Sequence, residues 1–238
     1  MLRENNFSKY LMYAVGEIVL VVIGILIALN INNWNENRKE NFLMITHIRS
    51  MGKEIQNDVL RTDKIISDLE LQENAGNKLI PIMESDQKII SDSLAFILAF
   101  NDFTTTPIIA NQNNTWDYLN SSGVLSEFPD ETLLNMLEEY YSDMHSLATN
   151  FTNTANPPRL EIRKLKYELF MDTEHRKFFP TATPVAPNKA VYNSIFEDYR
   201  ILPLCRYIGS TAIYFKGRFK SSEGKAKAII AYINKKYS

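Results

Sequence analysis

The residues able to do chemistry are few and scattered along the sequence. The three histidines, His47, His145 and His175, show neither the HxxxH nor the HExxH spacing of a zinc site. His145 fits an ordinary surface or groove histidine, with a ligand or acid–base role as the alternative. The single cysteine, Cys205, stands in the apolar context LPLCRY, as expected for a packed free thiol. Because GxSxG, GxGxxG and GxxxxGK[ST] patterns are also absent, we predict a non-enzymatic protein without catalytic residues, cofactor or metal.

Four aromatic side chains offer the best candidate for a ligand groove. Trp116 and Tyr118 precede a Ser-Ser-Gly turn, and Tyr140 and Tyr141 lie late in the following predicted helix. Aromatic walls that carry hydroxyl groups suit a small ligand or a peptide. The alternative is that these rings pack in the core with their polar tips at the surface.

A basic stretch, KGRFKSSEGKAK at residues 216–227, contains a single acidic residue. It could meet an anionic headgroup or the acidic face of a partner, or it could be a solvated helix junction. The chain as a whole has a formal charge of -2, which gives no indication of nucleic-acid binding.

An apolar segment near the N-terminus dominates the chain's organisation. Between Leu11 and Leu29 the only charged residue is Glu17, and these 19 residues would span roughly 28 Å as a helix, close to the ~30 Å hydrocarbon core. A cleaved signal peptide is the alternative, but Glu4 and Glu17 spoil a basic leader and IALNINNW offers no clean cleavage site. We expect an uncleaved anchor in the lipid bilayer, with the asparagines and Trp34 at the headgroup level.

The basic residues that flank this segment do not fix its orientation. Two precede it and four follow it: Arg3 and Lys9, then Arg38, Lys39, Arg49 and Lys53. A chain anchored at its N-terminus with about 200 residues following commonly translocates its large domain, since long domains cross largely regardless of charge. We expect the N-terminus inside and an extracytoplasmic domain.

Glu17, Gly24 and Ala28 are seven and four residues apart, so a helix places them on one face. Gly24 and Ala28 form a small-xxx-small pair, which lets another helix approach closely, and a carboxyl group beside that seam can hydrogen-bond across it. We predict a helix–helix contact here, with a second copy or with a partner membrane protein. The alternative is that Glu17 extends toward the nearer interface and the small residues are incidental.

Beyond Trp34 the pattern predicts a long amphipathic helix. Its apolar stripe follows alternating steps of three and four residues: Ile45, Ile48, Gly52, Ile55, Val59, Thr62, Ile66 and Leu69. The stripe suits a bundle core better than a coiled-coil dimer seam, because Gly52 and Thr62 weaken a seam. Gly76 is expected to end this helix as a C-cap, with Pro81 interrupting the next segment. The predicted parts are a cytoplasmic N-terminus (1–10), a transmembrane helix (11–33), a stalk or first bundle helix (34–75) and an extracytoplasmic helical domain (76–238).

The remaining segments read as further helices. Ser91 or Asp92 would cap a buried helix in SDSLAFILAF, for which a short strand is the alternative. Gly123 would end the next helix, Asp130 would start another, and NPPRLEIRKLKYELF would begin a further one. The proline-rich stretch 178–189 is expected to be a long loop or hinge. Pro203 is expected to break the last region, with a final amphipathic helix over residues 225–237. With eight glycines and nine prolines in 238 residues, an all-α antiparallel bundle on a membrane stalk is favoured over an all-β fold.

Two strings carry a resemblance to a known family. NFSKYLMYAVGEIVLVVIGILIALNINNWNENRK (6–39) resembles the N-terminus of a bacterial family of single-pass inner-membrane proteins whose domain has no assigned function, polar residues Glu17, Asn30, Asn33 and Trp34 included. TWDYLNSSGVLSEFPDETLLNMLEEYYS (115–142) is similar to that family's helix, turn and tyrosine-ended helix. The last 80 residues match only in style. The resemblance implies an inner-membrane anchor with a helical periplasmic domain, and it implies no activity.

The sequence therefore favours a scaffold or accessory subunit that acts through protein–protein contacts. The alternative is an extracytoplasmic sensing domain in which a ligand between helices signals through a membrane partner. A deep cleft with convergent polar groups would favour sensing, and a solid bundle with an exposed apolar surface would favour the scaffold.

Overall fold

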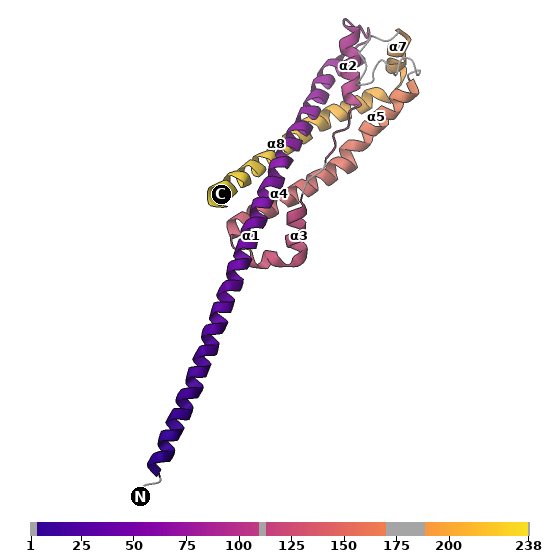
Figure 1. Cartoon of the computed structure of the whole chain (residues 1–238). Helices are drawn as coiled ribbons and strands as arrows, with labels where there is room; N and C mark the ends of the chain where they lie inside the picture. Colours follow the sequence, from indigo (N-terminus) through magenta and orange to yellow (C-terminus); the bar gives the residue numbers. More distant parts are fainter. Residues whose placement is uncertain (1–3, 110–112, 170–188, 238) are drawn as a thin grey trace. The chain divides into compact units, whose positions relative to one another are not determined.

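The computed structural model describes residues 4–109, 113–169 and 189–237, and every regular element within these ranges is helical (Figure 1). The chain divides into two compact units, one formed by residues 1–50 with Tyr237 and the other by Met51–Lys236. A long apolar N-terminal helix leads into a helical bundle, so the predicted all-α fold is confirmed.

The first unit consists mainly of the N-terminal part of helix α1 (Glu4–Glu84). Every described side chain from Tyr10 to Leu43 is exposed, and α1 contains the stretch that is long and apolar enough to cross a membrane. Just beyond that stretch, the guanidinium of Arg38 lies 5.8 Å from the centroid of the Trp34 ring. The Asn32 amide donates to the Glu36 carboxylate at 3.0 Å. Amphipathic and polar side chains of this kind suit the headgroup region of a bilayer.

The second unit contains the rest of α1 and the later helices. In chain order these are α2 (Ser93–Phe103), α3 (Asn114–Ser122), the 3₁₀ turn η1 (Val124–Glu127), α4 (Glu131–Asn150), the π-turn η2 (Phe151–Ala155), α5 (Asn156–Leu169), α7 (Lys189–Glu197) and α8 (Ile201–Tyr237). Three predicted helix signals are confirmed. The Asp92 side chain accepts from Ala95 N at 2.9 Å, Asp130 accepts from Leu133 N at 3.1 Å, and Gly123 adopts φ 75°. The predicted loop at 178–189 falls almost wholly outside the described residues.

Helix α8 runs antiparallel to the part of α1 within this unit (Figure 1). Arg206 pairs with Glu84 at 2.7 Å, and further along the two helices Lys216 pairs with Glu73. The prediction that Gly76 ends this helix as a C-cap is wrong. Helix α1 continues through Gly76 and Pro81 to Glu84. The physical reason is a helix crossing, because a Cβ built on Gly76 would lie 3.7 Å from the Cα of Gly209 on α8. The glycine serves close packing rather than helix termination.

The C-terminal helix is also longer than predicted. α8 begins at Ile201, so Pro203 lies in its first turn, where the missing N–H has no intrahelical partner to lose. The break before it lies at residues 198–200, after α7. The basic stretch 216–227 is the middle of α8 rather than a junction, because buried positions such as Phe219, Ser222 and Ala226 continue the core-facing stripe through it. Ile229 and Ile233 are buried further along the same stripe, and Ile230 is half-buried.

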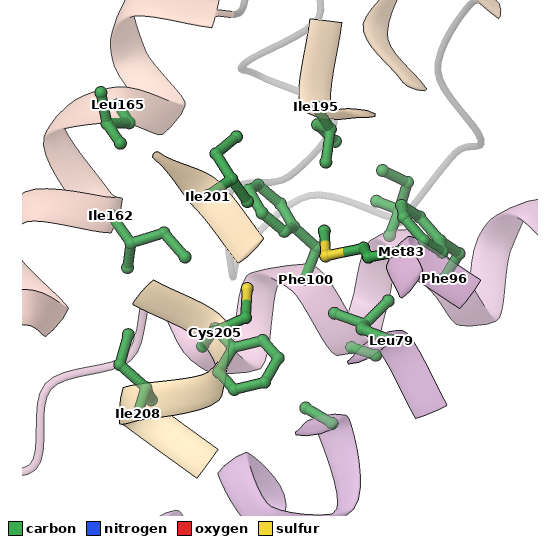
Figure 2. Close-up of a cluster of buried hydrophobic side chains, with 14 of the residues drawn as sticks. Leu79, Met83, Phe96, Phe100, Ile162, Leu165, Ile195, Ile201, Cys205 and Ile208 are labelled. Carbon is green, nitrogen blue, oxygen red and sulfur yellow. The ribbon is translucent and has the colours of Figure 1, made fainter. Parts of the chain in front are cut away.

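Five helices meet in a core of large apolar side chains (Figure 2). Leu79 comes from α1, Phe100 from α2, Ile162 from α5, Ile195 from α7 and Ile208 from α8, and each is at most 1% exposed. Burial of an aliphatic or aromatic side chain contributes about 1.5–3 kcal/mol, so this shared core holds α2, α5, α7 and α8 against α1.

Candidate functional site

The face of α1 that carries Glu17, Gly24 and Ala28 is exposed. The helix is uninterrupted through all three residues, so their spacing of seven and four places them on one face. All three are exposed, and no heavy atom lies within 4 Å of a Cβ built on Gly24. A helix–helix contact at this face stays a prediction.

Three of the four predicted groove aromatics come together in the second unit. The rings of Trp116 and Tyr141 stack with centroids 4.9 Å apart at 18°, and Tyr140 packs edge-on against Tyr141 at 5.2 Å. Tyr118 lies on the same helix as Trp116 but is 56% exposed. Tyr140 and Tyr141 are 1% and 7% exposed, so their rings belong to the packed interior. A ligand role for the four residues stays a prediction.

Polar groups of α1 face this aromatic cluster. The Tyr140 hydroxyl donates to Asp58 Oδ2 at 3.4 Å, while the Tyr141 hydroxyl is buried with no hydrogen-bond partner among the described residues. Burial, with Asp58 adding to it, raises the pKa of Tyr140, so this phenol remains protonated at neutral pH. Glu54 accepts from Thr115 N at 3.2 Å and from Thr115 Oγ1 at 2.7 Å, in the first turn of α3. The cluster thus joins α3 and α4 to α1.

A buried cation on α5, Arg159, forms the most highly connected polar centre of the bundle. Its side chain is 0% exposed. Nε and Nη2 donate to Gln72 Oε1 at 2.9 and 2.7 Å, and Nη1 donates to Ala155 O at 2.5 Å and to Thr211 Oγ1 at 3.2 Å. Burial lowers the pKa of Arg159 to about 10, because these oxygens replace water only in part. One side chain therefore links α1, η2 and α8.

A second buried cation, Lys166, lies two turns along α5 from Arg159 and contacts the Asn101 side chain, while Arg163 of the same helix caps α2. Lys166 Nζ donates to Asn101 Oδ1 at 2.6 Å, and Arg163 Nε donates to Thr104 O at 2.9 Å. Gln72 Nε2 donates to Thr105 O at 2.6 Å. Donors of this kind satisfy the carbonyls that a helix leaves unpaired at its C-terminus, and cations also complement its dipole.

The π-turn η2 follows directly from the dipeptide Pro157-Pro158. Neither proline has an N–H, so the carbonyls of Asn153 and Thr154 lose their usual helical donors. The backbone N–H of Asn156 instead bonds to Phe151 O, five residues back. The Tyr207 hydroxyl of α8 donates to the freed Thr154 carbonyl at 3.2 Å. This turn aims the Ala155 carbonyl at Arg159.

Arg159 and Lys166 lie in the interior of the bundle, which we did not predict from the sequence. The signal was present in the spacing, because Arg159, Ile162 and Lys166 are three and four residues apart and so share the core-facing side of α5. Of the histidines, His145 is exposed on α4 and His175 lies outside the described residues. Within the described ranges, no three His, Cys, Asp or Glu side chains are grouped as a metal site requires.

Comparison with known proteins places the chain in a family. A family of unknown function, DUF6090, matches residues 17–143, which is more than half of the chain. No curated protein and no solved structure matches. The matched range holds Glu17, Gly24 and the aromatic cluster, whereas Arg159 and α8 lie beyond it. The chain therefore belongs to the DUF6090 family of unknown function.

Proposed function

We propose that this protein is a membrane-anchored, non-enzymatic scaffold or accessory subunit that acts through protein–protein contacts. In this proposal the apolar part of α1 crosses the inner membrane of a bacterium once, with the N-terminus inside and the bundle in the periplasm. The partner is another membrane protein or a second copy of this chain.

The observation that carries the proposal is a contrast between glycines. Gly76 and Gly209 face each other where α1 and α8 cross inside the bundle. Gly24 lies on an equally regular helix, yet a Cβ added there would meet nothing within 4 Å. Other exposed glycines, such as Gly224, share this property, so the distinguishing feature of Gly24 is its place four residues before Ala28 in the apolar segment. In membrane helices, small residues four apart commonly mark the place where a second helix packs. We infer that the crossing partner of the Gly24–Ala28 face comes from another chain.

Glu17 gives this face its chemical specificity. An ionisable residue inside a membrane segment is costly to insert, which favours a role in the contact with a partner. A carboxyl group on the seam can hydrogen-bond across it, and such polar contacts between membrane helices are worth about 0.6–2 kcal/mol. That energy corresponds to a preference of roughly 3- to 30-fold over a contact that lacks the hydrogen bond.

In-cell crosslinking followed by purification tests the proposal. We compare the wild type with Glu17→Leu and Gly24→Leu at matched expression. The first variant removes the hydrogen-bonding group, and the second fills the small-residue notch while keeping the segment apolar. We expect a specific crosslinked species, either a partner or a dimer, that is lost or reduced several-fold in both variants.

Leu26→Ala supplies the matched control, because Leu26 lies on the opposite side of the helix and is 53% exposed. It should leave the crosslinked species unchanged. If no specific species forms in the wild type, or if all three variants lose it equally, the seam is not a docking face and the proposal fails.

A further inference from the structure

A chamber of about 410 Å³, half open to the surface, lies between the end of α4 with η2 and the middle of α8. Asn150 and Thr154 line one wall, and Tyr207, Tyr214 and Arg218 line the other. Among the described residues that line this chamber none is acidic, and Arg218 brings a positive charge to it. A volume of this size lies at the lower end of the range for small-molecule sites.

The chamber is backed by the buried charge of Arg159. Thr211 lines the chamber, and its Oγ1 receives the hydrogen bond from Arg159 Nη1 at 3.2 Å. The described partners of Arg159 are amide, carbonyl and hydroxyl oxygens, with no carboxylate among them. A buried cation without a counter-charge is costly, and its field is weakly screened in the interior. The Thr211 wall of the chamber is therefore a favourable place for an anion.

A smaller chamber of about 250 Å³ adjoins the first and shares Leu147 and Arg218 with it. Ser221, Ser222 and Lys225 line this extension. The Ser222 hydroxyl is buried without a hydrogen-bond partner among the described residues. Asp143 also lines it, but Lys225 pairs with that carboxylate. Lys225 also pairs with Glu139, so two carboxylates share this one lysine, and the extension adds hydroxyl groups beside Arg218.

From these features we propose that the chamber binds a small molecule that carries a phosphate or carboxylate group. Arg218 supplies the direct charge contact, and the amide of Asn150 supplies a hydrogen bond; the Thr211 hydroxyl already donates to Ile208 O at 3.1 Å. Arg159 stabilises the bound anion by its charge, from behind the Thr211 wall. The rings of Tyr207 and Tyr214 accommodate the apolar body of the ligand. This site is separate from the membrane face and goes beyond a scaffold role.

Isothermal titration calorimetry on the full chain in a non-ionic detergent tests the site. The probes are phenyl phosphate, benzoate and phenol, which share a ring and differ in charge. We expect one site per chain for phenyl phosphate or benzoate and no measurable binding of phenol. Arg218→Gln should weaken anion binding at least tenfold.

Lys220→Gln is the matched control, because it removes one exposed positive charge from the same helix without touching the chamber. It should bind the probes as the wild type does. Arg218 is exposed, so its replacement leaves the fold intact; Tyr214→Ala, which removes a wall without changing charge, serves as a second variant. Absence of binding by both anions, or equal affinity in Arg218→Gln and wild type, overturns the proposal.

A lipid headgroup and a soluble metabolite could supply the same anionic group. Nanodiscs of phosphatidylcholine and of phosphatidylglycerol separate these sources. Competition against phenyl phosphate by phosphatidylglycerol alone supports the site and identifies a headgroup as the ligand. Equal phenyl phosphate affinity in both nanodiscs supports the site and identifies a soluble anion.

Discussion

Replacing Gly76 or Gly209 by alanine should stabilise the bundle, although the two glycines face each other at a helix crossing. A Cβ at Gly76 would lie 3.5 Å from Phe103 Cζ, 3.6 Å from Ile80 Cδ1 and 3.7 Å from Gly209 Cα. A Cβ at Gly209 would lie 3.6 Å from Ile80 Cδ1 and 4.0 Å from Gly76 Cα. All of these are ordinary van der Waals contacts. Alanine is favoured over glycine in a helix interior by about 0.5–1 kcal/mol, so each variant should gain roughly that amount.

Thermal unfolding followed by circular dichroism measures the effect on the full chain in detergent. For a unit of this size, a gain of about 0.5–1 kcal/mol raises Tm by roughly 1–4 °C. Gly224→Ala is the control, because no atom lies within 4 Å of its Cβ and the change reports helix propensity alone. Gly76→Leu should lose about 1–3 kcal/mol, since its further atoms would overlap Phe103 and α8.

A loss of more than about 1 kcal/mol in Gly76→Ala, with Gly224→Ala stabilised as expected, would refute this reasoning. It would mean that a Cβ at Gly76 meets Gly209 Cα more closely than 3.7 Å, so that the crossing tolerates glycine alone. If Gly76→Ala, Gly209→Ala and Gly224→Ala gain equal stability, the crossing has room for one methyl group and helix propensity alone sets the effect.

Two further predictions follow from buried titratable groups. Burial lowers the pKa of Lys166 to about 8, against about 10.4 in the unfolded chain. Between these values the unfolded chain binds one more proton than the folded chain, so the free energy of unfolding should rise by about 1–3 kcal/mol from pH 8 to pH 10. Denaturant titrations of wild type and Lys166→Met should show this rise only in the wild type. Cys205 is 0% exposed and burial raises its pKa to about 12, so maleimide should label it only after unfolding. An exposed thiol, Ser210→Cys in a Cys205→Ala background, should react in the folded protein, and an impermeant maleimide applied to spheroplasts should label it if the bundle is periplasmic.

The sequence was informative wherever a local rule decides the structure. Asp92 and Asp130 were identifiable as helix starts because a short acidic side chain can accept from the N–H three residues on. Gly123 was identifiable as a helix end because φ 75° is cheap only for glycine. The apolar segment that includes Leu11–Leu29 was identifiable by length and composition alone. None of these features depends on a distant part of the chain.

Predictions failed where a distant contact decides. Gly76 looks like a helix end in sequence, but its role depends on Gly209, 133 residues later, at the crossing with α8. Pro203 looks like a breaker, but it lies in a first turn whose start is fixed by the packing of Ile201 and Cys205 in the core. Arg159 looks like a surface cation within NPPRLEIRKLKYELF, and only the fold shows Gln72 and Thr211 beside it.

The dipeptide Pro157-Pro158 connects the interior of the bundle to its proposed ligand site. By removing two N–H donors it creates the π-turn, which leaves the Thr154 carbonyl to Tyr207 and directs the Ala155 carbonyl to Arg159. Thr154 and Tyr207 both line the chamber, and Arg159 lies one hydrogen bond behind it. The local backbone defect, the buried cation and the cavity therefore arise at one place. An anion bound there would offset part of the cost of burying Arg159, so occupancy of the chamber should stabilise the packing of α5 against α1 and α8.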